Sequence, residues 1–175
     1  MVPLPRNLPV RMLTVLFLLT ALPLVAAAAD TTAPVGFGKW TPAQLQEIGA
    51  RLEKKLGDKN LVFETLSTTK GHSVYLVLRG KTAPAEYHET ESDIQIGVSG
   101  TATFVIGGEL VNPQKLPRKQ QQGSGINGGA RFPVGPGDVI HVPVAVPHVL
   151  IIDPKKPYLY ILIKLDEEPR EPAHD

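Results

Sequence analysis

Residues 80–100 read GKTAPAEYHETESDIQIGVSG, with a glycine at each end of the stretch. Glu86 and His88 are two positions apart, so on a strand both side chains point to the same face. Four residues separate His88 from Asp93, enough for a tight turn that returns the chain alongside itself. The pattern predicts two short neighbouring strands that present three candidate metal ligands.

Residues 137–148 read GDVIHVPVAVPH and end on His148. This histidine can reach the same interior as His88 only if strands from the two segments close into one barrel. The result would be two imidazoles and up to two carboxylates, from Glu86 and Asp93. Such a set suits Fe(II), Mn(II), Zn(II) or Ni(II) and does not suit Cu(I). Fewer than four protein ligands would leave positions open for water or substrate.

The first segment resembles the first motif of the cupin family, G-x5-H-x-H-x(3–4)-E-x6-G. Gly80, Gly100 and His88 match it with every spacing kept. The chain departs from the motif at two ligand positions, where Glu86 replaces the first histidine and Asp93 replaces the glutamate.

The second segment resembles the second cupin motif, G-x5-P-x-G-x2-H-x3-N. Gly137, Pro143 and His148 match it, while Ala145 stands at the glycine position and Ile152 at the asparagine position. The resemblance covers about residues 61–165. It implies an all-β fold, a single cupin-type antiparallel β-barrel of the double-stranded β-helix or jelly-roll kind, with one N-terminal helix.

The resemblance also implies a function, and three alternatives stay open. Similar cupins include dioxygenases, isomerases, decarboxylases and epimerases, so the first is a metal-dependent enzyme of oxygenase or isomerase type acting on a small molecule. The second is a non-catalytic module that binds a small ligand such as a sugar or an organic acid. The third is a degenerate barrel with neither metal nor ligand. For the site itself, Glu86 and Asp93 could be ordinary exposed charges at strand ends, and the two histidines could merely form hydrogen bonds inside a metal-free pocket.

The N-terminus has the layout of a signal peptide. Arg6 and Arg11 precede an apolar run from Met12 to Val25, and four alanines before Asp30 offer a cleavage site. We therefore predict a signal peptide at residues 1–29 and export to the periplasm or beyond. The alternative is an uncleaved membrane anchor, because an apolar run of this length is near the lower limit for spanning a bilayer.

Composition limits the number of domains, the classes of chemistry and the partners that the chain can have. A length of 175 residues suits one domain, and the absence of cysteine excludes thiol nucleophiles, cysteine zinc sites and disulfides. The net charge of +1 leaves no electrostatic footprint for nucleic acid. After signal cleavage no membrane partner is expected, and the predicted partners are a small-molecule ligand or substrate and a second copy in a homodimer.

The rest of the chain divides into a lead-in with a helix at residues 30–60, the barrel at 61–165 and a disordered tail at 166–175. Thr41, Pro42 and Gln44 predict a capped helix start, and Gly57 a helix end. We expect this helix to cover an edge or end of the barrel. Strands are expected in the ranges 61–67, 72–79, 85–89, 94–99, 101–106, 138–142, 149–152 and 158–165.

Two further regions are interpreted from their residue patterns. Residues 110–130, with prolines, three glutamines and many glycines, are interpreted as a long mobile loop, either a lid or a solvated insertion. In the last strand Tyr158, Tyr160 and Lys164 share one face. We expect that face to point outward, because Leu159, Ile161, Ile163 and Leu165 would then fill the core. Inward placement would make Lys164 a buried cation near the site.

Overall fold

The structure is a computed structural model that describes residues 33–168. The predicted signal peptide and most of the predicted tail lie outside the described residues, so export and cleavage stay predictions. The predicted homodimer also stays a prediction. No helix in the described part of the chain is long and apolar enough to cross a membrane.

One helix and thirteen strands make up the regular structure of residues 33–168. The elements are α1 (Pro42–Leu56), β1 (Leu61–Thr69), β2 (His72–Arg79), β3 (Ala85–His88), β4 (Glu91–Ser99), β5 (Ala102–Ile106), β6 (Glu109–Val111), β7 (Gln114–Leu116), β8 (Gln120–Gly123), β9 (Gly125–Asn127), β10 (Ala130–Val134), β11 (Val139–Val142), β12 (His148–Ile151) and β13 (Tyr158–Asp166). All eight predicted strands are present, with ends that differ by three residues at most.

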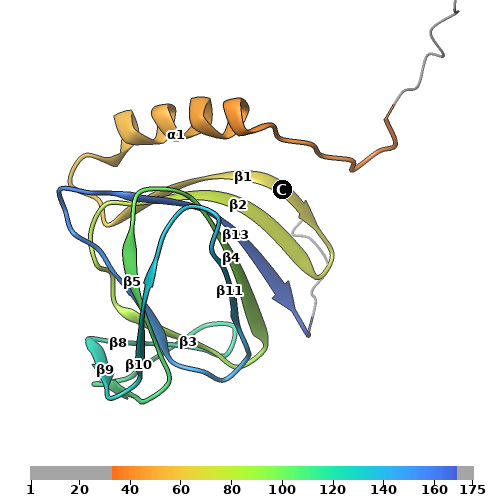
Figure 1. Cartoon of the computed structure of the whole chain (residues 1–175). Coiled ribbons are helices and arrows are strands. Elements are labelled where there is room, and N and C mark those ends of the chain that lie inside the picture. Colours follow the sequence, from red (N-terminus) through yellow and green to blue (C-terminus); the bar gives the residue numbers. More distant parts are fainter. Residues whose placement is uncertain (1–32, 169–175) are drawn as a thin grey trace, which may run out of the picture. The chain divides into compact units, whose positions relative to one another are not determined.

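The strands form two facing antiparallel sheets and a small third one (Figure 1). The five-stranded sheet has the order β1-β2-β13-β4-β11, and the six-stranded sheet has the order β10-β5-β12-β3-β8-β7. The third sheet pairs β6 with β9. Buried residues from both large sheets, among them Val77, Phe104, Leu150 and Tyr160, form one cluster between them. The fold is the all-β cupin-type fold that the two motifs imply.

The helix begins and ends where the sequence predicts. Thr41 and Gln44 form a capping box, and Gly57 ends the helix with a positive φ of 47°. Leu52 is fully buried, and it lies in a cluster with Leu76 of β2 and Leu159 of β13. The helix therefore covers the outer face of the five-stranded sheet beside its edge strand β1, as Figure 1 shows.

The interpretation of residues 110–130 as a long mobile loop is wrong. This range holds most of β6, all of β7, β8 and β9, and the first residue of β10. Gln120 pairs with His88 and Gln122 with Glu86 across β8 and β3. Strands β6 to β9 are three or four residues long, too short for an alternating pattern to emerge. Backbone pairing to a neighbouring strand, rather than apolar side chains, holds them in place.

The expected orientation of β13 is also wrong. Tyr158 and Tyr160 are fully buried in the cluster between the sheets, and Lys164 points to the same side. The leucine and isoleucine face points outward instead, where Leu159 and Ile161 pack under α1. The helix supplies a second apolar layer, so outward apolar residues on this strand are not exposed to water at that end.

Candidate metal centre

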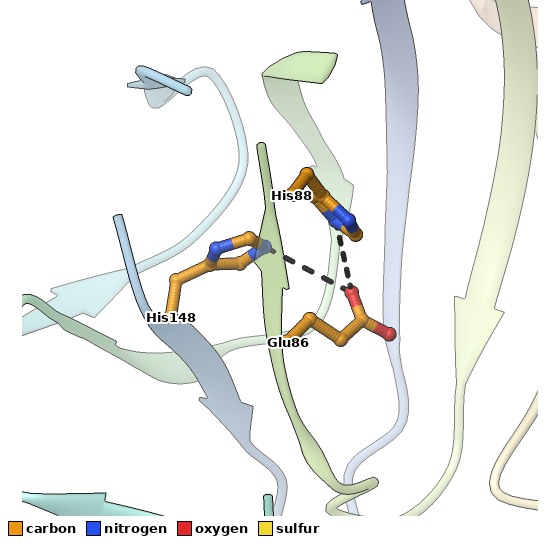
Figure 2. A group of neighbouring side chains, drawn as sticks. All are labelled: Glu86, His88 and His148. Carbon is orange, nitrogen blue, oxygen red and sulfur yellow. Dashed lines mark ion pairs between the residues drawn. The ribbon is translucent and has the colours of Figure 1, made fainter. Parts of the chain in front are cut away.

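Three predicted ligands meet between the two sheets. Glu86 and His88 lie on one face of β3, and His148 begins β12, where it is paired with Glu86. Ligand atoms of the three residues all lie within 4.8 Å of one another. Figure 2 shows the three side chains pointing toward a common centre.

A turn before β12 helps to place His148. Ala145 has a positive φ of 59°, the left-handed region that favours glycine, and it stands where the cupin motif has its glycine. Its backbone N–H donates to the carbonyl oxygen of His88 at 2.7 Å. This hydrogen bond ties the approach to β12 to the end of β3, so the two histidines are held together by the backbone.

The ring of His148 has a defined orientation. Its Nδ1 lies 3.0 Å from the carbonyl oxygen of Val146, and a carbonyl can only accept, so Nδ1 donates. The other nitrogen, Nε2, is then an acceptor, and it is buried without a hydrogen-bond partner. It lies 3.8 Å from Glu86 Oε2 and 3.7 Å from Asp93 Oδ2. Three acceptor atoms, on the buried His148 and Asp93 and the partly buried Glu86, thus surround a point without a donor between them, which is the arrangement a cation would satisfy.

His88 is buried beside the same point. Its ring centroid is 5.3 Å from that of His148, and its Nε2 lies 3.8 Å from Glu86 Oε2. Burial, together with the neighbouring Lys164 ammonium and His148, lowers the pKa of His88 to about 3. His88 is therefore uncharged at neutral pH, as a metal ligand must be.

Asp93 reaches the site from the opposite sheet. It is 2% exposed, and its Oδ2 lies 3.9 Å from His88 Nε2. Its Oδ1 accepts a hydrogen bond of 2.9 Å from Lys164, the residue directly opposite it on β13. The close three-residue group does not include Asp93, so its role as a metal ligand stays a prediction.

Lys164 is part of the site, contrary to the outward orientation expected from the sequence. Its ammonium donates to His88 Nε2 at 3.2 Å and to Glu91 Oε2 at 3.4 Å, besides its bond to Asp93. Burial alone would lower its pKa, but Asp93 and Glu91 outweigh burial and raise the pKa above the ordinary value. Lys164 is therefore a resident cation at the edge of the candidate metal centre.

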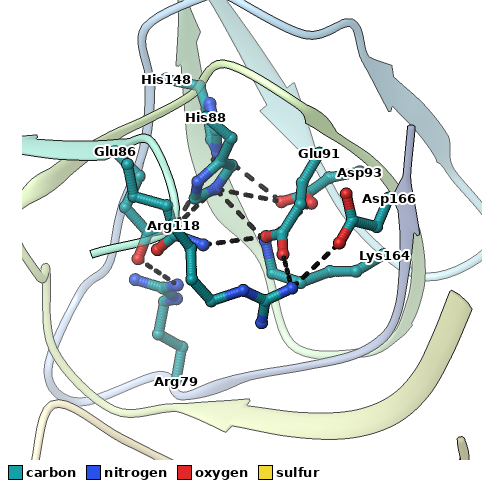
Figure 3. Close-up of polar contacts among 10 residues, drawn as sticks. Arg79, Glu86, His88, Glu91, Asp93, Arg118, His148, Lys164 and Asp166 are labelled. Atoms are coloured by element: carbon teal, nitrogen blue, oxygen red, sulfur yellow. Dashed lines mark hydrogen bonds and ion pairs between the residues drawn. The ribbon is translucent and has the colours of Figure 1, made fainter. Parts of the chain in front are cut away.

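A second group of charges extends the network in ways that the sequence did not predict (Figure 3). Glu91 is 5% exposed and pairs with Arg118 at 2.9 Å. Arg118 also pairs with Asp166 at 3.0 Å, and Gln120 donates to Glu91 at 2.9 Å. Arg118 and Gln120 come from the range interpreted as a mobile loop, so that segment supports the site.

Arg79 lies on the other side of Glu86. Its Nη2 is 3.8 Å from Glu86 Oε1, and its Nε donates to the Tyr160 hydroxyl at 3.2 Å. Burial alone would lower the pKa of Arg79, but Tyr160 and Glu86 raise it above its ordinary value. Burial raises the pKa of Tyr160 in turn. Sequence reasoning missed Arg79; the only available signal was its place at the end of a strand, just before the Gly80 that opens the first motif.

A cavity of about 370 Å³ adjoins the centre. Its polar lining comes from Arg79, Glu86, Tyr160 and Lys164. The rest of the lining consists of side chains of β1, β2 and β13, namely Leu61, Phe63, Thr65, Tyr75, Val77 and Leu162. The site therefore has an approach large enough for a small organic molecule.

Two facing antiparallel sheets with a Glu–His–His group between them define the class of this protein: an all-β, cupin-type chain with a candidate metal-binding centre. No family model matches the sequence, and no protein of curated function matches it either.

Solved structures resemble the chain at the level of overall architecture. One is a candidate mannose-6-phosphate isomerase from Ralstonia eutropha JMP134, with 20% identity, a TM-score of 0.47, and coverage of 63% of this chain and 88% of that one. The polyketide cyclase RemF from Streptomyces resistomycificus has 16% identity and a TM-score of 0.45, over 65% and 69% of the chains. The DMSP lyase DddQ from Ruegeria pomeroyi DSS-3 has 17% identity and a TM-score of 0.43, over 67% and 50%. Likeness at this level carries no information on activity.

Proposed function

We propose that the chain binds one divalent metal ion through Glu86, His88 and His148 and acts through it on a small molecule, as a metal-dependent enzyme. The observation that supports this most strongly is the buried Nε2 of His148, an acceptor without a donor, beside carboxylate oxygens of Glu86 and Asp93. Two imidazoles and a carboxylate are a ligand set that suits Fe(II), Mn(II), Zn(II) or Ni(II).

A bound metal would act as a Lewis acid or hold oxygen, with positions left open by the small number of protein ligands. The chain's own residues would orient those ligands. The Val146 carbonyl fixes the His148 tautomer, and Arg79 lies beside the Glu86 oxygen that faces away from the histidines. A hydrogen-bonded partner such as the Val146 carbonyl raises metal affinity by about 10–100-fold.

A second function is favoured by one specific contact. Lys164 donates to His88 Nε2, so a cation already engages one of the lone pairs that a metal would need. In a metal-free chain this ammonium would hold the ligand set together, and the cavity would serve a non-catalytic module that binds a small ligand. The two alternatives differ in whether the purified protein holds a stoichiometric metal.

The test is elemental analysis of the protein purified from its own compartment, for the wild type, H88A, H148A and H141A. His141 is an exposed histidine of β11 and serves as the matched control. We expect about one metal ion per chain in the wild type and in H141A. In H88A and H148A the affinity should fall by more than about 100-fold, because losing a direct ligand exceeds the effect of losing a hydrogen-bonded partner. Equal metal content in all four proteins would contradict the assignment.

Export remains part of the proposal. The positive start, the apolar run and the four alanines before Asp30 support cleavage after residue 29. Mass spectrometry of the protein recovered from the periplasm or the medium should give a chain beginning at Asp30. An intact N-terminus on membrane-bound protein would support the anchor instead.

A further inference from the structure

Arg79 is a buried cation whose hydrogen-bonding capacity is mostly unused. It is 6% exposed, and the one hydrogen bond of its side chain among the described residues is the 3.2 Å contact from Nε to Tyr160. The nearest carboxylate oxygen, on Glu86, is 3.8 Å from Nη2, which is beyond hydrogen-bonding distance. Within residues 33–168 no acceptor takes a hydrogen bond from either Nη atom. Neither Nη atom is among the fully buried atoms that lack a partner, so both are open to the cavity and free to donate to a ligand there.

Lys164 lines the same cavity as Arg79 but differs from it in its hydrogen-bond partners. Its ammonium has three acceptors, on Asp93, His88 and Glu91, which match the three protons it can donate. Lys164 is therefore satisfied by the protein itself. Arg79 lines the same cavity with free donors in the planar fork that fits a carboxylate in two places at once.

The rest of the cavity lining indicates the chemistry of the rest of the ligand. Away from Arg79 and Glu86 its walls are mostly apolar, and Phe63 is 56% exposed on the β1 side of the opening. A volume of about 370 Å³ is at the small end of ligand pockets. A small molecule with an anionic end and an apolar body fits both the size and the lining.

The charges of the network agree with such a ligand. Leaving the histidines aside, the groups joined by ion pairs are three cations and four carboxylates: Arg79, Arg118 and Lys164 with Glu86, Glu91, Asp93 and Asp166 (Figure 3). The network therefore carries one excess negative charge. A divalent metal together with one monocarboxylate would bring it to neutrality.

We propose that Arg79 binds the carboxylate of a small organic acid whose apolar part fills the cavity, and that such acids are the substrate class of the site. Naming the acid a substrate rests on the proposed function. The hydrogen bonds to Arg79 do not need the metal, and a bound metal would tighten binding of the acid by offsetting the excess negative charge of the network. A monocarboxylate fits better than a phosphate, because Glu86 lies beside Arg79 and a second negative charge on the ligand would be repelled.

Isothermal titration calorimetry with matched probes tests the binding step. The probes are 3-phenylpropanoate, its neutral amide 3-phenylpropanamide, and phenyl phosphate, each titrated into the full chain after removal of metal by chelation and again with Zn²⁺. We expect the acid to bind at least about tenfold more tightly than the amide, because each hydrogen bond to a charged group adds to affinity. Equal binding of acid and amide, or binding of neither, would overturn the proposal, as would a preference for phenyl phosphate.

Three variants separate this inference from the metal proposal. In R79K the preference for the acid over the amide should fall about tenfold, since lysine cannot form the bidentate contact that arginine makes with a carboxylate. R131K changes an exposed arginine of β10 and should keep the preference. H148A should lose the metal and keep the preference for the acid. The metal proposal and the proposal for Arg79 can therefore fail independently of each other. Loss of the preference in R131K as well would overturn the assignment to Arg79.

A fourth variant does not depend on how R79K folds. Thr65 is exposed and lines the cavity, so T65W should obstruct it without disturbing a buried contact. We expect T65W to bind the acid at least about tenfold more weakly at an unchanged melting temperature, because filling the cavity removes contact area. Unchanged binding of the acid in T65W would place it elsewhere and overturn the proposal.

Discussion

The two faces of β13 differ in what they pack against, although their residues alternate along one strand. On the outer face, Leu159 lies in an apolar cluster with Leu52 of α1. On the inner face, Tyr160 and Lys164 contact Arg79 and Asp93. The polar side of the strand is the inner one. A covering helix allows this, because it gives the outer apolar residues somewhere to be buried.

Strand β4, next to β13, shows the same inversion. Its inner row, Glu91, Asp93 and Gln95, is no more than 5% exposed, while Ile94 and Ile96 on the outer row are half-buried. Buried charged groups are weak contributors to stability, and each must be paired to be tolerated. Both layers bury apolar side chains, but only the inner layer also holds buried charged groups, and these are arranged around the candidate site.

The largest expected effect is on the inner layer, from K164M. Without the ammonium, the 2%-exposed Asp93 loses its hydrogen-bonded cation. We expect the free energy of unfolding of the metal-free protein to fall by about 3 kcal/mol, as when one partner of a buried pair is removed. Urea denaturation with and without Zn²⁺ measures this, and added metal should recover much of the loss.

The matched control is K119M. Lys119 pairs with Glu168 at 2.8 Å, but both side chains are more than half exposed. An exposed pair of this kind contributes at most about 1 kcal/mol. If K164M and K119M destabilise the metal-free protein equally, Lys164 does not hold the inner layer together, and the contrast between the two faces of β13 fails.

On the outer layer, L52A should give an effect of similar size. Leu52 is fully buried beneath the helix, so its truncation should cost about 2–5 kcal/mol in the free energy of unfolding. Metal content and binding of 3-phenylpropanoate should stay unchanged in the folded fraction. K54A, at an exposed helix position, should change stability by less than about 0.5 kcal/mol. Loss of metal in folded L52A would show that the two layers are not separable.

The same comparison explains what sequence reasoning could and could not predict. The helix ends, the eight main strands and the meeting of Glu86, His88 and His148 follow from local patterns and motif spacing. The orientation of β13 does not, because alternation alone tells which residues share a face and not which face is inner. The expectation that leucines and isoleucines face the core was wrong because α1 provides a second place to bury them.

The supporting charges of the site could not be predicted for a different reason. Arg79, Glu91 and Arg118 belong to no motif and reach the centre from three separate strands or turns. Gln120 lies in a strand of four residues, whose pairing with β3 depends on the three-dimensional arrangement rather than on its own composition. A motif identifies the groups that bind directly, while the groups that orient them depend on the sheet order.

The third prediction concerns the hydroxyl of Tyr158, a buried group of the inner layer without a hydrogen-bond partner. Burial, together with Tyr160, raises the pKa of Tyr158 to about 12. The pKa of an unfolded tyrosine is near 10. The contribution that Tyr158 makes to stability through this shift is therefore fully present below about pH 10 and is lost as the pH rises through about 12. The wild type should lose about 2–3 kcal/mol relative to Y158F across this interval.

Urea denaturation of the wild type and Y158F between pH 8 and pH 12 measures the difference. At neutral pH the phenylalanine variant should be more stable by about 1 kcal/mol, because it removes an unpaired buried hydroxyl. Stability curves that stay parallel up to pH 12 would show that Tyr158 is not held protonated by the fold.

The smallest effect is expected at the start of the helix that covers the outer layer. Thr41 accepts a hydrogen bond from the backbone N–H of Gln44, and the Gln44 side chain accepts one from the backbone N–H of Thr41. T41A removes the first of these bonds and should lower the free energy of unfolding by about 1 kcal/mol. T68A, at an exposed position near the end of β1, is the control and should change it by less than about 0.5 kcal/mol. If T41A also weakened binding of metal or of the organic acid, the helix would act on the inner layer as well as cover the outer one, and the division between the two faces of β13 would have to be redrawn.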